Sequence, residues 1–237
     1  MEQRPQPRPM PVDAEEYSSR FSLTNFVNAY CQVRDALKYR PDRILVIGVG
    51  VGLEPLLLRQ KFHREVCTLD IDAGFGPDYV GSVHDMKMFS DRQFDVVIAS
   101  HVLEHLPFSY FRDCLAELAR VARHALVYLP YGGRHLEWKF VLSQRCREYA
   151  IRLRLPPRKC VDGEHPDLQA AQHYWECGYP GFSVKRISSI MAEYFHIDET
   201  YHNQDWKYSL NFLLTSRHAQ SKETVAPGDV ADRRLAG

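Results

Sequence analysis

The feature that most constrains the fold of this chain is a glycine-rich turn within residues 43–58. The run RILVI precedes Gly48, Gly50 and Gly52, and the run LEPLLL follows them. This pattern predicts a buried strand, a tight turn and the start of a helix, because glycine supplies positive φ and leaves no side chain between the backbone and a ligand. The dinucleotide fingerprint G-x-G-x-x-G requires a glycine at position 53, where this chain has Leu53.

An acidic residue ends the second predicted strand. Residues 65–72 read EVCTLDID, and Asp70 lies 18 residues after Gly52, as expected if one helix separates the two strands. In a βαβ unit an acid at this place reaches the crevice at the carboxyl end of the strand and accepts hydrogen bonds from ribose hydroxyls. The turn and the acid together favour a nucleoside-binding site.

Strand-like apolar segments alternate with amphipathic helices along most of the chain. Residues 94–100 read FDVVIAS and are almost entirely apolar, as expected of a strand in a sheet covered on both faces. The alternation predicts a parallel, doubly wound α/β sheet. The expected strands are 43–47, 66–70, 79–83, 94–100 and 125–129, followed by an antiparallel pair at 195–201 and 208–215.

The chain is long enough for one sizeable core, and its charge is balanced. It has 237 residues with 30 Lys+Arg and 30 Asp+Glu, so no net charge attracts nucleic acid or a membrane. Its six cysteines form no C-x-x-C pair, and no apolar run reaches the roughly 20 residues of a membrane span, which favours a cytoplasmic protein. We expect a proline-rich disordered segment at 1–13, a single domain at 14–217 and a disordered tail at 218–237.

Three further motifs complete a resemblance to a known family. Phe94-Asp-Val-Val97 is followed by Val102-Leu-Glu-His105-Leu-Pro107 and, later, by His173-Tyr-Trp-Glu176. With the glycine turn, they are similar to the motifs of class I S-adenosylmethionine-dependent methyltransferases, bacterial members included, over most of residues 40–215. The resemblance implies a Rossmann-like sheet of seven strands, mostly parallel with the last antiparallel. It also implies a lid insertion after strand five, at about 131–182.

The resemblance further implies S-adenosyl-L-methionine as the cofactor and identifies the residues around it. The glycines of the turn face its methionine and ribose moieties, and the acid of the second strand binds the ribose. The end of strand three borders the adenine, and the end of strand four lies beneath the sulfonium. The implied cofactor residues are Gly48, Gly50, Gly52, Asp70, Ser82, Val83, Ser100 and His101.

The segment after strand five, where this fold usually adds substrate-binding elements, contains a histidine close to a carboxylate. His173 with Glu176 is a candidate general base for a hydroxyl or amine acceptor, because the pKa of histidine lies near working pH. His105 is a candidate for lining the transfer pocket. The alternative is that these residues only pack and hydrogen-bond, since methyl transfer mainly needs in-line positioning. The expected acceptor is a small molecule or a glycan, with O-methylation favoured over N-methylation on family analogy.

Two positions depart from the family pattern. Many relatives carry an acid two residues before the first glycine, where this chain has Val46, and an adenine-contacting Asp on strand three, where it has Ser82. Glu54 is a neighbour that can take over part of the lost contacts. The departures keep open a non-catalytic cofactor-binding or regulatory protein of the same fold. A nicotinamide-dependent oxidoreductase is a second alternative, which Leu53 disfavours.

A zinc motif is formally present but is not expected to bind metal. Residues 101–105 read HVLEH and match H-x-x-E-H. That motif requires a continuous helix to bring both imidazoles to one face. Here His101 directly follows a buried strand and Pro107 restricts any helix through the motif. We therefore expect no metal site.

Residues 136–159 are locally basic. They contain seven basic residues against Glu137 and Glu148, and their apolar residues recur at helical spacing. This predicts an amphipathic helix with a basic face. Three roles stay open for it: a lid helix with solvated arginines, docking of an anionic acceptor on Arg145, Arg147, Arg152 or Arg154, and docking on a membrane surface.

Overall fold

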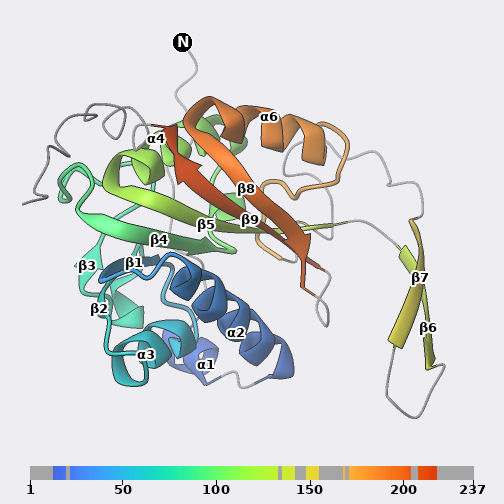
Figure 1. The fold of residues 1–237 in the computed structure, drawn as a ribbon, viewed down its shortest axis with the longest axis horizontal. Coiled ribbons are helices and arrows are strands. Elements are labelled where there is room, and N and C mark those ends of the chain that lie inside the picture. The colour runs from blue at the N-terminus through green and yellow to red at the C-terminus, as the bar shows by residue number, and fades with distance from the viewer. Residues whose placement is uncertain are drawn as a thin grey trace, which may run out of the picture.

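The computed structural model describes the central part of the chain, drawn as ribbons in Figure 1. The described residues are 13–19, 22–132, 135–141, 148–154, 168, 171–203 and 208–217. The segments expected to be disordered, 1–13 and 218–237, lie outside this set except for Asp13, which caps helix α1.

One seven-stranded sheet forms the centre of the fold, in the order β3-β2-β1-β4-β5-β9-β8. Strands β3, β2, β1, β4 and β5 pair in parallel, and β9 pairs antiparallel with both β5 and β8. The bounds are β1 Arg43–Ile47, β2 Glu65–Asp70, β3 Tyr79–Val80, β4 Phe94–Ser100, β5 Ala122–Pro130, β8 Phe195–His202 and β9 Ser209–Ser216. The predicted doubly wound sheet, with its last strand inserted antiparallel, is confirmed.

Helices cover both faces of the sheet (Figure 1). The α-helices are α1 Ala14–Ser18, α2 Leu23–Lys38, α3 Leu53–Gln60, α4 Phe111–Val121 and α6 Val184–Tyr194; the short 3₁₀ helices are η1 Ala73–Phe75, η2 Leu103–His105 and η3 Phe108–Tyr110. Side chains on β1 alternate between the two layers: Leu45 and Ile47 belong to the core under α4 and α6, while Ile44 and Val46 belong to the core under α2 and α3. This alternation is why the strand is apolar throughout.

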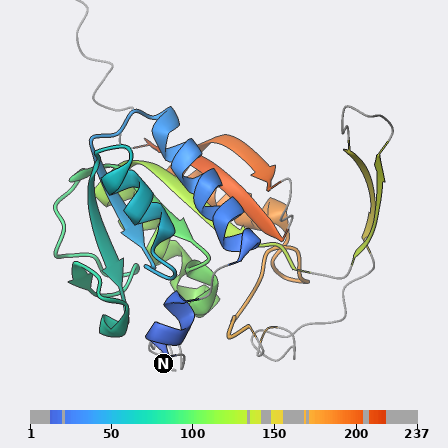
Figure 2. The same cartoon turned by 90° about the horizontal axis from the view of Figure 1, so that it is seen from below.

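The prediction of a helix at 136–159 is wrong. The described residues there form a separate antiparallel hairpin of β6 (His135–Val141) and β7 (Glu148–Arg154), which stands away from the main sheet in both views (Figures 1 and 2). Leu136 is paired with Leu153, and Trp138 with Ile151, so these four apolar residues share one face. Within each strand these residues recur at every second position, as expected of a strand. Over the whole segment the apolar residues also recur at helical spacing, which led to the wrong prediction.

The described part of the chain contains no helix that has both the length and the apolar character needed to traverse a bilayer.

Candidate active site

The glycine turn lies at the carboxyl end of β1, where the first crossover begins. Gly48, Gly50 and Gly52 have φ of 79°, 53° and 70°, a region that side chains other than glycine rarely adopt. A Cβ added to Gly48 would lie 2.6 Å from Cγ2 of Val102, just after β4. A Cβ on Gly52 would meet no atom within 4 Å. The turn therefore presents bare backbone beside open space.

Asp70, the last residue of β2, is tied directly to this turn. Its Oδ2 accepts a hydrogen bond from the backbone N–H of Val49 at 2.8 Å, and its Oδ1 accepts one from the N–H of Asp72 at 2.9 Å. The side chain is largely buried. A carboxylate has about four acceptor positions, so two such bonds leave capacity for ribose hydroxyls.

The position that carries an acid in many related proteins is Val46, which is buried in the core. The nearest substitute in sequence is Glu54 in the first turn of α3, which is also buried. Burial raises the pKa of Glu54 to about 7. Near neutral pH this carboxyl group exchanges between its acid and its ionised form, and a cationic ligand group would favour the ionised form.

The residues implied to border the adenine and the sulfonium are all at the same sheet edge. Ser82 Oγ lies 2.7 Å from Nδ1 of His84, and Ser100 Oγ accepts a hydrogen bond from Nδ2 of Asn28 at 3.1 Å. Val83 is buried in the core. Asn28 brings α2 over the end of β4, a contact that sequence reasoning missed.

His101 follows β4 in a left-handed conformation, with φ of 54°. Such a conformation costs a non-glycine residue roughly 1–3 kcal/mol and is concentrated at functional sites. Its Nε2 lies 3.2 Å from Oγ of Ser209, and its Nδ1 lies 3.5 Å from Oε1 of Glu104.

The structure brings His173 and Glu176 together, as the sequence predicted. His173 Nδ1 lies 2.7 Å from Oε1 of Glu176, and the hydroxyl of Tyr208 donates to the same oxygen at 2.5 Å. Burial lowers the pKa of His173, but the hydrogen bond to Glu176 and the charges of Glu104 and Glu176 outweigh it and leave that pKa raised.

His105 joins this group from η2. Its ring lies edge-to-face on the ring of His173, with centroids 4.7 Å apart, and its Nδ1 lies 3.1 Å from the carbonyl oxygen of Gln172. A carbonyl can only accept, so Nδ1 carries the proton and Nε2 carries the lone pair. Burial lowers the pKa of His105, which favours the neutral ring.

Glu104 is the least expected member of the group. Its side chain is fully buried, and neither carboxylate oxygen has a hydrogen-bond partner. Burial alone would raise the pKa of Glu104. The neighbouring imidazoles favour the ionised form, His101 most strongly, and together they lower the pKa below its usual value. Glu104 was not assigned to the site from the sequence, because nothing in the motif signals that its carboxylate faces His173 from 3.9 Å.

Tyr208 was also missed. It precedes β9, far along the chain from His173 and Glu176, and only the antiparallel insertion of β9 beside β5 places it at this edge. The position of Tyr208 directly before β9 is a signal, since the start of a strand inserted antiparallel to β5 lies at the carboxyl end of β5.

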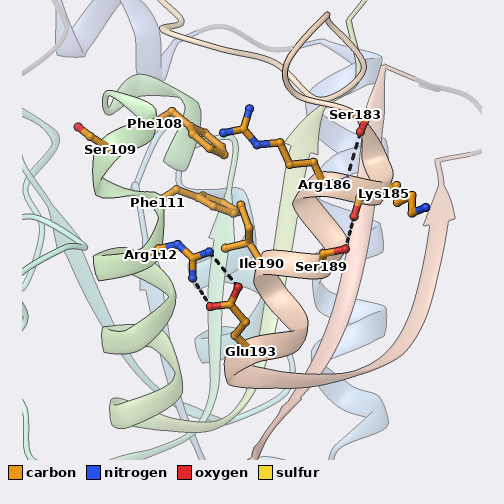
Figure 3. A pocket seen from close by; sticks show the side chains of 10 residues that line it. All are labelled: Phe108, Ser109, Phe111, Arg112, Ser183, Lys185, Arg186, Ser189, Ile190 and Glu193. Carbon is orange, nitrogen blue, oxygen red and sulfur yellow. Dashed lines mark hydrogen bonds and ion pairs between the residues drawn. The ribbon is translucent and has the colours of Figure 1, made fainter.

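Two surface hollows lie elsewhere. One, of about 690 Å³, is a groove between α4 and α6 (Figure 3). Three of its charged side chains already have partners: Arg112 pairs with Glu193, and the guanidinium of Arg186 lies 4.9 Å from the ring centroid of Phe108. The other, of about 760 Å³, lies between α2 and β8. Neither is lined by the glycine turn, so the backbone geometry of the turn, and not a hollow, identifies the site.

Comparison with known proteins agrees with this geometry. Residues 45–125, from β1 into β5, match the family model described as a methyltransferase domain. No curated protein sequence matches the chain.

Solved structures share the fold at low sequence identity. The N-methyltransferase NodS from Bradyrhizobium japonicum WM9, in complex with S-adenosyl-L-homocysteine, is 12% identical with a TM-score of 0.54, over 86% of this chain and 96% of that one. The PH0226 protein from Pyrococcus horikoshii OT3 is 13% identical with a TM-score of 0.53, over 85% and 95%. An O-methyltransferase family protein from Burkholderia thailandensis is 10% identical with a TM-score of 0.50, over 86% and 59%. The chain thus has an α/β methyltransferase fold that is consistent with S-adenosylmethionine as its cofactor.

Proposed function

We propose that the protein is an S-adenosylmethionine-dependent methyltransferase acting on a small-molecule or glycan-type acceptor. The observation that carries this proposal is the turn after β1, where three glycines have positive φ and the last of them, Gly52, faces open space, with Asp70 bonded to the turn. The match of residues 45–125 to a methyltransferase domain supports the same reading.

The residues at the carboxyl edge fit the cofactor. Gly50 and Gly52 leave the backbone uncovered, and Asp70 has acceptor capacity left for the two ribose hydroxyls. Ser82 and the backbone of Val83 would border the adenine, and Ser100 and His101 would lie beneath the sulfonium. Glu54 is the acid that we propose takes over from the missing one at Val46.

S-adenosylmethionine supplies a methyl group activated by its sulfonium. On the acceptor side, His173 donates its Nδ1–H to Glu176, which holds the ring and leaves the Nε2 lone pair to accept a proton from an acceptor hydroxyl. When bound, S-adenosylmethionine would supply its methyl group by direct displacement at the methyl carbon: the acceptor oxygen would attack that carbon and S-adenosyl-L-homocysteine would leave. His105 lines the same pocket.

The acceptor class is supported by family analogy, with O-methylation favoured over N-methylation. Cys67 and Cys114 are free thiols, which supports a reducing compartment such as the cytoplasm.

Calorimetric titration with S-adenosylmethionine, S-adenosyl-L-homocysteine and NAD tests the cofactor. We expect the first two to bind and NAD not to bind. At about 100-fold above Kd, S-adenosyl-L-homocysteine stabilises the fold by about 2.7 kcal/mol, which a melting scan resolves. A shift with NAD alone would favour the oxidoreductase. Binding without labelled-methyl transfer to any component of a cell extract would favour the non-catalytic alternative.

A further inference from the structure

Three side chains of the acceptor-side group converge as metal ligands would. One ligand atom from each of Glu104, His105 and His173 lies within 4.8 Å of the other two. A metal about 2.0–2.2 Å from each ligand atom requires those atoms to be within about 4.2 Å of one another. We infer that Glu104, His105 and His173 form a binding site for a divalent transition-metal cation such as Zn²⁺, Mn²⁺ or Fe²⁺. Movements of less than about 1 Å would complete it.

Both imidazoles are already oriented for coordination. His105 Nδ1 is engaged by the carbonyl oxygen of Gln172, and His173 Nδ1 by the carboxylate of Glu176, at 3.1 and 2.7 Å. In metal sites a ligating histidine typically donates its other ring N–H to a carbonyl or carboxylate, which fixes the tautomer and the ring. Here both rings follow that arrangement, and Nε2 of each is left as the nitrogen with a lone pair.

Glu104 supplies the second, independent observation. Its carboxylate is fully buried, and neither oxygen has a hydrogen-bond partner among the residues that the structure describes. The nearest imidazole nitrogens, on His101 and His173, are 3.5 and 3.9 Å from Oε1, beyond a hydrogen bond of about 2.7–3.2 Å. A buried carboxylate without a partner is destabilising, and such groups are normally paired or coordinate a metal. A cation between Glu104 and the two imidazoles would satisfy it.

The ligand set differs from the H-x-x-E-H motif that sequence analysis set aside. That motif was rejected because it needs a continuous helix, and the structure has only the short η2 there. The third ligand instead comes from His173, 68 residues after His105, where the backbone N–H of Tyr174 bonds to the carbonyl oxygen of Glu104 at 2.9 Å. His173 therefore lies close to Glu104 and His105 because of tertiary folding and not because of helical spacing.

The chemistry of the set points to a first-row transition metal. Two imidazoles and one carboxylate suit zinc or ferrous iron, while magnesium and calcium prefer all-oxygen ligands. Three protein ligands also leave a coordination position open. The role of that position rests on the proposed function: it would bind the acceptor oxygen and lower the pKa of the acceptor hydroxyl. His173 Nε2 would then be a ligand, not the proton acceptor.

The test uses the full-length protein without a polyhistidine tag, treated with a chelator and then titrated with ZnCl₂ or MnCl₂. We expect one ion bound per chain and a raised melting temperature. Glu104→Gln and His173→Ala should each weaken binding by more than about 100-fold, and Glu176→Gln, which removes only the support of His173, by about 10–100-fold. His196→Ala is the matched control, because His196 is a largely exposed histidine remote from the group.

Glu104→Gln separates a metal ligand from a merely structural group. The melting temperatures of the variant and of the parent protein are first measured in chelator; when metal is added, only the melting temperature of the parent should rise. No binding at millimolar Zn²⁺ and Mn²⁺, or binding that both ligand variants leave unchanged, would overturn the site. S-adenosyl-L-homocysteine binding is measured separately in chelator. If the cofactor binds in chelator and methyl transfer continues, the proposed role of the metal in the reaction is wrong, and the proposed methyltransferase activity is retained.

Discussion

The carboxylate of Asp70 accepts a hydrogen bond from the backbone N–H of Val49 at 2.8 Å, so the end of β2 is fixed to the turn after β1. Asp70→Ala should weaken binding of S-adenosyl-L-homocysteine, because each hydrogen bond to a charged acceptor is worth about 1.5–3 kcal/mol. Titration calorimetry measures the loss. Asp72→Ala is the companion variant: if it abolishes binding while Asp70→Ala does not, Asp72 holds the ribose and our placement is wrong.

Gly50→Val should abolish cofactor binding while the sheet persists. The residue has φ of 53°, and the nearest atom to an added Cβ is Cε1 of Tyr17 at 3.7 Å, so the new side chain would occupy the space proposed for the ligand. Gly76→Val provides the control, since Gly76 has a similar φ of 61° and nothing within 4 Å of its Cβ position. Circular dichroism and calorimetry on both variants separate backbone strain from steric exclusion. Equal losses of binding in the two would refute the prediction.

His173→Ala should lower turnover by about 10²–10⁴-fold with cofactor affinity nearly unchanged, because the residue acts on the acceptor and not on the cofactor. His105→Ala should weaken binding of both the cofactor and the acceptor, since His105 lies closer than His173 to the end of β4. Steady-state kinetics with calorimetry distinguishes the two patterns. A decrease of only a few-fold for His173→Ala, together with a lower melting temperature, would assign His173 to packing.

Gly132→Ala should displace Glu176. The added Cβ would lie 2.1 Å from Oε2 of Glu176 and 2.2 Å from Cε2 of Tyr179, so at least one side chain must move. Overpacking of this kind costs about 1–3 kcal/mol. We expect lower stability in chemical denaturation and lower turnover, because Glu176 no longer orients His173. Full activity in Gly132→Ala would show that this orientation is dispensable.

Asp35→Asn should destabilise the opposite face of the sheet. Asp35 is fully buried and accepts hydrogen bonds from the hydroxyl groups of Tyr128 and Tyr201 and from Arg34. Burial raises its pKa, but these hydrogen bonds outweigh it and leave that pKa lowered. We expect a loss of about 1–3 kcal/mol on denaturation at neutral pH.

The lowered pKa of Asp35 determines how stability depends on pH. A carboxyl with a lowered folded pKa stabilises the fold above its unfolded pKa of about 3.9, and this stability is lost as pH falls further. Melting scans from pH 7 to pH 3 should therefore show a steeper loss for the parent protein than for Asp35→Asn. Parallel curves would indicate that Asp35 is not ionised in the native state.

The sheet and the cofactor side were predictable because their signals are local. The glycine spacing dictates the backbone of the turn, and the apolar runs of β1 and β4 follow from cover on both faces. The acceptor side was predictable only in part. His173 and Glu176 are three residues apart and meet through local geometry, whereas the approach of Glu104 to His173 depends on how two distant loops pack.

The hairpin of β6 and β7 was predicted wrongly because its local sequence pattern fits two structures. Trp138 and Leu153 fit both a helical stripe and a face of alternating strand residues, so periodicity alone could not decide between them. Cross-strand pairing decides it, and pairing is a non-local property. Arg152 and Arg154 consequently lie on a strand and not on the predicted helix, while Arg145 and Arg147 lie outside the described residues.

The close approach of Gly48 to Val102 means that the cofactor turn and the acceptor-side loop share one contact surface. Two ligands that each order one side of a shared surface are thermodynamically linked, and the linkage is reciprocal. If S-adenosyl-L-homocysteine tightens acceptor binding by some factor, the acceptor must tighten S-adenosyl-L-homocysteine binding by the same factor. The contact of a valine methyl group with a glycine is thus one place where coupling between the two ligands would pass through the scaffold.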